Sequence, residues 1–288
     1  MCLYLAIGGE YRRNMCSDAL DTSDETMTYK TLKFEVGAQI ATITLHRPDA
    51  ANSLNLQMGD ELLMVANHCT SNPDIRAVIL TAEGKMFCAG GDVTGFADSD
   101  NPGELLRAIT SGLHAAIQRF VRMDAPLIIA VNGMAAGAGM SLAASGDIIL
   151  AAESAQFTMA YTRIGLSPDG SSTFFLPRLI GPLKAKELMM RNAVLTAAEA
   201  LELGLVSQVI PDAELMAAAR ETARELAAGP TRAYGEIKRL VADSFNNSLD
   251  TQLERETRAI AELASHSEDA RSGIAAFVAK QPPTFKGR

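Results

Sequence analysis

Tryptophan is absent from this chain, and aromatic residues make up only 5% of its 288 residues. A hydrophobic core must therefore be built from aliphatic side chains, which supply most of the 48% hydrophobic content. No apolar run approaches the roughly 20 residues that a membrane-spanning helix needs. The composition predicts an ordinary globular protein with no membrane partner.

Cysteine and positive charge are also scarce. The four cysteines have neither metal-ligand spacing nor the density of a disulfide scaffold, so we expect reduced thiols, a cytoplasmic location and no metal site. The formal net charge is −8. Nucleic-acid binding requires a basic face, so this charge disfavours a nucleic-acid partner.

The first 29 residues lack the pattern of a folded element. A short apolar patch at residues 2–7 precedes Arg12 and Arg13 rather than following them, which is the reverse of a signal peptide. Residues 17–28 are polar and acidic. We therefore expect residues 1–29 to form a disordered N-terminal extension.

From residue 30 onward the pattern is that of an α/β protein. Two β-rich runs, residues 31–36 and 40–45, flank a Gly-Ala pair and predict a hairpin. Asn52 and Ser53 are candidate caps for a helix over residues 54–67. We expect a β/α core over residues 30–212. The helical periodicity that follows predicts an all-helical region over residues 213–288, and its apolar stripes suggest packing on a neighbouring subunit.

The stretch from residue 130 to residue 178 carries the candidate chemistry. An apolar run leads into a turn containing Gly133, Gly137 and Gly139, and a helix-compatible segment follows. Bare glycine backbone lets a ligand approach the main chain, and the first N–H groups of a helix are free to bind it. Asp169 follows on a turn in otherwise apolar surroundings. Backbone donors beside one carboxylate are the groups that enolate chemistry needs.

Six segments, in this order along the chain, resemble the crotonase (enoyl-CoA hydratase/isomerase) superfamily. They are HRPDAANSLN (46–55), FCAGGDV (87–93), AVNGMAAGAG (130–139), GDIILAAESAQF (146–157), IGLSPDGSSTFFLPRLIG (164–181) and ALELGLVSQVI (200–210). The resemblance implies a spiral of ββα units with the helical region at the C-terminus. It also implies an acyl-CoA ligand, no cofactor beyond the CoA moiety, and a homotrimer or a dimer of trimers.

The same resemblance places the two backbone donors of an oxyanion hole at Gly91 and Ala138. A thioester oxygen gains negative charge when the α-proton leaves, and two fixed N–H dipoles stabilise that charge. Losing one such donor typically costs ~10²–10³ in rate. Asp92 and Asp147 lie near the two turns, and we interpret both as structural residues that close loops through backbone hydrogen bonds.

Within the superfamily, residues 157–178 and the C-terminal residues are most similar to the isomerases of phenylacetate catabolism, which act on ring-epoxidised phenylacetyl-CoA. Hydratases of the superfamily carry two glutamates, and the matching positions here are Ser141 and Tyr161, which are not carboxylate bases. Asp169 stands where the isomerases keep an acid, and burial with few hydrogen-bond donors would make it a better base. We therefore expect an acyl-CoA isomerase with Asp169 as the proton shuttle, acting either on a Δ3-enoyl-CoA or on a ring-epoxide.

Other interpretations of the same residues stay open. Asp169 is also a common turn residue before Gly170, or a cap for a helix beginning near Ser171. Replacement of both glutamates is also consistent with an acyl-CoA binding protein that has no catalytic activity. The spacing of His114 and Asp169 resembles a halobenzoyl-CoA dehalogenase, in which the aspartate attacks an aromatic ring, although that branch keeps a tryptophan where this chain has Tyr161.

The resemblance also implies residues that contact CoA. It places Ala51 and Ser53 near the adenine end of CoA and Lys85 near the phosphates. Two further contacts come from the C-terminal tail. A local cation would offset the polyanionic ligand on an acidic protein, whereas the alternative for Lys85 is a solvated surface lysine. The implied contacts are Ala51, Ser53, Lys85, Ala89, Phe285 and Lys286.

Overall fold

The computed structural model describes residues 29–288, whose strands form two sheets. Six strands make the main sheet in the order β1-β2-β3-β5-β7-β10, and four make a smaller sheet in the order β4-β6-β8-β9. The pairs β1–β2 and β8–β9 are antiparallel, and all other neighbours run parallel. The strands are β1 (Leu32–Gly37), β2 (Ile40–Leu45), β3 (Ala77–Ala82), β4 (Met86–Cys88), β5 (Leu127–Val131), β6 (Met134–Ala136), β7 (Ile148–Ala152), β8 (Gln156–Thr158), β9 (Leu195–Thr196) and β10 (Gln208–Ile210).

The chain alternates between the two sheets before each helical segment. Strand β3 of the main sheet leads to β4 of the smaller sheet and then to helices, and β5–β6 and β7–β8 repeat this order. This is the expected spiral of ββα units, with helices at the C-terminus. The helices are α1 (Leu56–Ser71), α2 (Val93–Ala97), α3 (Pro102–Arg122), α4 (Ala138–Ala143), α5 (Ser172–Ile180), α6 (Pro182–Arg191), α7 (Ala197–Glu202), α8 (Leu215–Ala227), α9 (Thr231–Ser244), α10 (Leu249–His266) and α11 (Glu268–Val278).

The predicted N-terminal hairpin is confirmed, but the predicted start of the first helix is wrong. Strands β1 and β2 pair from Leu32–Leu45 to Gly37–Ile40. The cap of α1 is Asn55, whose side chain accepts a hydrogen bond from Met58 N. Asn52 is instead buried and donates to the carbonyl oxygens of Glu83 and Met86. Its side chain is thus used to hold two loops together rather than to begin a helix.

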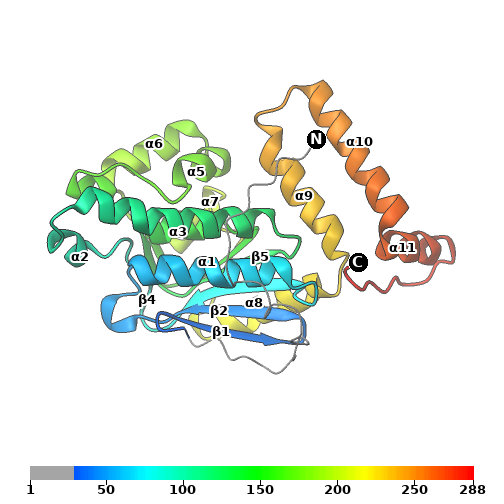
Figure 1. The fold of residues 1–288 in the computed structure, drawn as a ribbon, viewed down its shortest axis with the longest axis horizontal. Coiled ribbons are helices and arrows are strands. Elements are labelled where there is room, and N and C mark those ends of the chain that lie inside the picture. Colours follow the sequence, from blue (N-terminus) through cyan, green and yellow to red (C-terminus); the bar gives the residue numbers. More distant parts are fainter. Residues whose placement is uncertain (1–28) are drawn as a thin grey trace, which may run out of the picture.

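The core is aliphatic, as the composition requires, and it centres on the main sheet. Every residue of β3 and β5 is buried, which is typical of parallel strands covered on both faces. Helices α1 and α3 pack on each other along one side of the sheet (Figure 1). Helix α8 packs against β3, β5 and β7, so the first helix after residue 212 covers the sheet.

The last three helices extend to one side of the α/β body (Figure 1). Helix α9 is attached through Lys238, a buried residue that donates to the carbonyl oxygens of Phe120 and Ala125 and forms an ion pair with Asp147. Helix α10 has no buried residue. Its exposed apolar side chains remain available for packing against another surface.

Two further expectations concern the N-terminal extension and membrane-spanning helices. The proposed disordered extension, residues 1–29, lies outside the described residues except for Tyr29. No described helix combines the length and the apolar character needed to cross a membrane.

Candidate active site

Two glycine-bearing turns, one after β4 and one after β6, meet back to back. Gly90 has φ +101° and Gly137 has φ +52°, values that residues with a Cβ rarely adopt. A Cβ at Gly90 would lie 3.5 Å from the nitrogen of Ala138, and one at Gly139 would lie 2.3 Å from the carbonyl oxygen of Cys88. Glycine at these positions therefore allows the two backbones to touch.

This contact brings the N–H groups of Gly91 and Ala138 to the wall of one cavity. Ala138 is the first residue of α4, so its N–H has no partner inside the helix. Within residues 29–288, neither of these two N–H groups donates a hydrogen bond to the protein. Both donors are thus free for a ligand oxygen.

The cavity has a volume of about 450 Å³ and is lined mostly by apolar side chains. Asp169 and Tyr161 face it from the segment between β8 and α5, while Arg107 and Arg163 are exposed residues of its lining. An apolar cavity with a few convergent polar groups is typical of a small-ligand site. Of the residues predicted from the sequence, it brings together Gly91, Ala138, Asp169 and Ala89.

A chain of hydroxyl groups holds the Asp169 carboxylate. The Tyr161 hydroxyl donates to Asp169 Oδ1 over 2.5 Å, and Ser141 Oγ lies 3.2 Å from the same hydroxyl. The side chain of Asp169 is 30% exposed, and within the described residues it accepts a hydrogen bond from Tyr161 alone. The donors are thus few, but the carboxyl is only partly buried. Its carboxylate does not cap α5, because only its backbone carbonyl accepts a hydrogen bond there, from Ser172 Oγ.

Tyr161 stays protonated in this arrangement. Burial raises the pKa of the Tyr161 hydroxyl above its ordinary value of 10.0, and the negative charge of Asp169 and the hydrogen bond to it raise that pKa further. The hydroxyl is therefore a permanent donor to Oδ1 at neutral pH. Ser141 and Tyr161 together position the Asp169 carboxylate.

His114 supports the turn that carries Asp169. Its Nε2 atom accepts a hydrogen bond from the backbone N–H of Gly170 over 3.1 Å. The same Nε2 lies 3.9 Å from Asp169 Oδ2. Because Nε2 is the acceptor for Gly170, the hydrogen-bond network puts the ring proton on Nδ1, and the histidine does not donate to Asp169.

Three further residues implied for CoA, Ala51, Ser53 and Lys85, lie outside the lining of this cavity. The carbonyl oxygen of Ala51 accepts a hydrogen bond from Ala89 N. Arg47 donates to the carbonyl oxygen of Ser53 over 2.5 Å and forms a 3.0 Å ion pair with Asp92. Lys85 is exposed and has no carboxylate partner within the described chain. Sequence reasoning missed Arg47, which links the loop containing Ser53 to the loop containing Asp92.

Asp92 and Asp147 have the structural roles expected from the sequence. Asp92 caps α2 by accepting a hydrogen bond from Gly95 N. Asp147 accepts one from Leu127 N over 2.7 Å. Asp92 thus fixes the loop after Gly91, and Asp147 fixes the start of β5.

Phe285 and Lys286 lie elsewhere in the chain's own fold. The carbonyl oxygen of Phe285 accepts a hydrogen bond from Arg76, and Lys286 N donates to the buried carboxylate of Asp269 over 2.6 Å. Neither side chain lines the cavity that contains Asp169. One copy of the chain therefore does not bring these two residues to the other CoA candidates.

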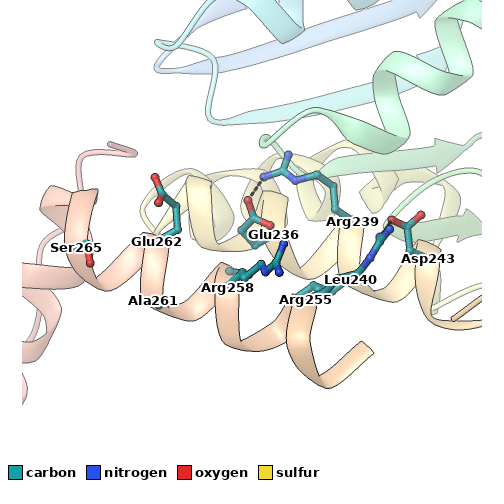
Figure 2. Close-up of a pocket in the computed structure, with 10 residues that line it drawn as sticks. Glu236, Arg239, Leu240, Asp243, Arg255, Arg258, Ala261, Glu262 and Ser265 are labelled. Atoms are coloured by element: carbon teal, nitrogen blue, oxygen red, sulfur yellow. Dashed lines mark hydrogen bonds and ion pairs between the residues drawn. The ribbon is translucent and has the colours of Figure 1, made fainter. Parts of the chain in front are cut away.

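A larger hollow, of about 670 Å³, lies between α9 and α10 (Figure 2). Its arginines are already paired, as Arg239 is with Glu236 and Arg255 is with Asp243. It contains neither glycine turn, so we place the candidate acyl site in the smaller cavity. No group of three or more His, Cys, Asp or Glu side chains among residues 29–288 is arranged to hold a metal ion.

Comparison with known proteins identifies the family of this chain. The profile of the family described as enoyl-CoA hydratase/isomerase matches residues 35–288. The 1,2-epoxyphenylacetyl-CoA isomerase of Escherichia coli K12 is 39% identical over 251 residues, which cover 86% of this chain and 95% of the relative. A 4-chlorobenzoyl coenzyme A dehalogenase of Arthrobacter sp. is 32% identical over 84% of this chain and 88% of its own length.

A solved structure shows the same fold. The crystal structure of an enoyl-CoA hydratase from Polaromonas sp. JS666 matches with a TM-score of 0.83 and 34% sequence identity, covering 88% of this chain and 99% of the solved one. The profile match and the relatives together span most of the chain. The chain belongs to the enoyl-CoA hydratase/isomerase family.

Proposed function

We propose that this protein is an acyl-CoA isomerase that works through a thioester enolate. The observation that carries the proposal is a single carboxylate, Asp169, that lines the same cavity as the free N–H groups of Gly91 and Ala138. The positions of both hydratase glutamates are hydroxyl residues, and Tyr161 holds the carboxylate. One base is sufficient for a proton transfer within a substrate, whereas activating water for addition calls for further carboxylates.

In the proposed reaction, Asp169 removes a proton from C2 of the acyl group and returns it at C4. The electron pair of the broken C–H bond moves to the thioester oxygen, which the N–H groups of Gly91 and Ala138 stabilise. Tyr161 occupies Oδ1, which leaves Oδ2 as the oxygen that carries the proton. Reprotonation at C4 converts a Δ3-enoyl thioester to its Δ2 isomer, so no water and no redox step is needed.

Two acyl groups fit the proposal. A linear 3-enoyl-CoA needs only the proton transfer just described. The 39% identical isomerase from E. coli carries 1,2-epoxyphenylacetyl-CoA in its name, and the mainly apolar lining of the cavity is compatible with an uncharged ring. Comparing the turnover rates of these two thioesters on the same protein shows which acyl group is preferred.

The decisive experiment is exchange of the C2 protons of acyl-CoA in heavy water, followed by mass spectrometry. We expect deuterium incorporation in the wild type and a loss of roughly 10²–10⁴ in rate for Asp169→Asn, since general base catalysis contributes about that much. Asp74→Asn is the matched control, because Asp74 is an exposed carboxylate in the turn before β3 and outside the cavity.

The outcomes of this experiment are distinct. Equal exchange in wild type and Asp169→Asn would remove Asp169 from the mechanism. Tight acyl-CoA binding with no exchange in either protein would favour a binding role without catalysis. Accumulation of a 3-hydroxyacyl product from a 2-enoyl-CoA would show hydratase activity and contradict the proposal.

Dehalogenation is a second candidate, supported by the 3.9 Å distance between His114 Nε2 and Asp169 Oδ2 and by the similarity to the Arthrobacter dehalogenase. In that reaction Asp169 would attack the ring carbon and halide would leave. Against it, Nε2 accepts a hydrogen bond from Gly170 and Tyr161 occupies Oδ1. Chloride release from 4-chlorobenzoyl-CoA, lost in both Asp169→Asn and His114→Ala, would establish this candidate in place of the isomerase.

The quaternary structure is part of the proposal. Phe285 and Lys286 lie apart from the cavity of their own chain, and α10 and α11 carry exposed apolar residues such as Ile260 and Phe277. A homotrimer, or a dimer of trimers, would cover these side chains and could bring a neighbour's tail to the CoA. The acyl-CoA remains the small-molecule partner.

A further inference from the structure

The candidate acyl cavity shares a wall with a second hollow. This neighbouring groove has a volume of about 670 Å³ and lies between α1 on one side and α2 and α3 on the other. Two apolar side chains, Phe96 of α2 and Ile109 of α3, line both spaces. A movement of either side chain would therefore join the cavity to the groove.

Phe96 is the less constrained of the two. Ile109 is 5% exposed and belongs to α3, a helix of 21 residues. Phe96 belongs to α2, which has five residues, none of them buried. The edge of the Phe96 ring rests on the Gly91 backbone, because a Cβ at Gly91 would lie only 2.7 Å from Phe96 Cζ. The ring thus closes the cavity directly beside one of the two free N–H groups, with little packing behind it.

The groove beyond Phe96 has a surface that suits an uncharged chain. Leu56 and Met64 of α1 line it and are 42% and 51% exposed. Carboxylates of Asp60 and Asp92 also line it, and Arg47 already neutralises Asp92. An aliphatic chain would cover the apolar side chains, whereas a chain ending in a carboxylate would meet like charge.

We propose that Phe96 sets the acyl-chain length of this protein. With the ring against Gly91, the cavity accepts short or compact acyl groups. When the ring swings away, a long uncharged chain passes into the groove between α1 and α3. This inference rests on the proposed function in one respect only, which is that an acyl-CoA occupies the cavity.

The effect is measurable as binding, independently of turnover. Each methylene of the acyl chain that is removed from water increases the affinity roughly fourfold. For the wild type we expect this increment up to the chain length that fills the cavity and a clearly smaller one beyond it, because longer chains must displace the ring. In Phe96→Ala the fourfold increment should continue to longer chains.

The experiment is calorimetric titration with saturated acyl-CoAs of 4, 8, 12 and 16 carbons. Phe96→Trp, with a larger ring, should stop the increase at a shorter chain than the wild type. Phe34→Ala is the matched control, since Phe34 lies on β1 and lines neither space. A 16-carbon chain ending in a carboxylate should gain no affinity from Phe96→Ala.

The results separate this inference from the proposed function. If the wild type binds acyl-CoA and shares one chain-length profile with both Phe96 variants, Phe96 is not the determinant and the proposed function is untouched. If Phe34→Ala changes the profile as much as Phe96→Ala, the effect is not local to the cavity wall and the inference is overturned. Absence of binding for every acyl-CoA would overturn both.

Discussion

At the scale of single residues, the site depends on a carboxylate held by hydroxyl groups. Tyr161 donates to Asp169 Oδ1, and Ser141 lies within hydrogen-bond distance of the Tyr161 hydroxyl. A glutamate at either position would place a second negative charge beside Asp169, which disfavours ionisation of both groups. Hydroxyl groups at both positions hold Asp169 without that repulsion.

Tyr161 should leave a signature in the pH dependence of stability. Its pKa is raised above 10.0 in the folded chain by burial and by Asp169, so the folded state keeps a proton that the unfolded state loses. The contribution of Tyr161 is fully present below pH 10 and is lost as pH rises further, with a slope of up to about 1.4 kcal/mol per pH unit. Urea unfolding at several alkaline pH values should show a shallower decline for Tyr161→Phe. Parallel declines in the two proteins would show that Tyr161 ionises freely.

At the scale of structural elements, the contact between the two turns limits substitution. A Cβ at Gly139 would lie 2.3 Å from the carbonyl oxygen of Cys88, so an alanine there must push the turns apart. We expect Gly139→Ala to lower the free energy of unfolding by about 1–3 kcal/mol and to reduce C2 exchange, because Ala138 is the adjacent residue.

Gly37→Ala is the matched control for that substitution, since a Cβ at Gly37 would meet nothing within 4 Å. We expect its unfolding free energy, measured by urea titration, to stay within about 0.5 kcal/mol of the wild type. An unchanged stability for Gly139→Ala would show that the turns can separate without cost.

The sequence predicted elements well where the signal was local, and less well where it depended on distant partners. The hairpin follows from two β-rich runs that flank a Gly-Ala pair, and β5 follows from the apolar run before the turn that contains Gly133. The start of α1 was misplaced because Asn52 is used by carbonyl groups more than thirty residues away. The bond between Tyr161 and Asp169, and the wall formed by Phe96, depend on side-chain directions that no spacing reveals.

At the scale of the whole molecule, one buried carboxylate contributes to holding the C-terminal segment. Asp269 accepts hydrogen bonds from the backbone N–H groups of Lys286 and Gly287, at 2.6 and 2.7 Å. Asp269→Ala leaves both without that acceptor, so we expect a loss of about 1–3 kcal/mol in the unfolding free energy and faster tryptic cleavage after Lys280 and Lys286. Asp250→Ala, at an exposed carboxylate of α10, is the control. Equal cleavage rates in the two variants would show that the segment is held by other contacts.

The proposed assembly gives a second prediction at this scale. Ile260 on α10 is 70% exposed, so Ile260→Glu should leave the fold of one chain intact while it weakens contacts between copies. Light scattering after size exclusion should show three or six copies for the wild type and fewer for this variant. Val36→Glu, at an exposed position of β1, should behave like the wild type. A monomeric wild type would contradict the proposed oligomer.

The junction of the two turns also bears on how such a protein changes over generations. Its hydrogen-bond donors, the N–H groups of Gly91 and Ala138, belong to the main chain, and a substitution by any residue other than proline does not delete them. A lineage that inherits the turns can lose or relocate its carboxylate and still present both donors. A change of reaction then requires only new side chains around the cavity, because the glycines keep both donors in place.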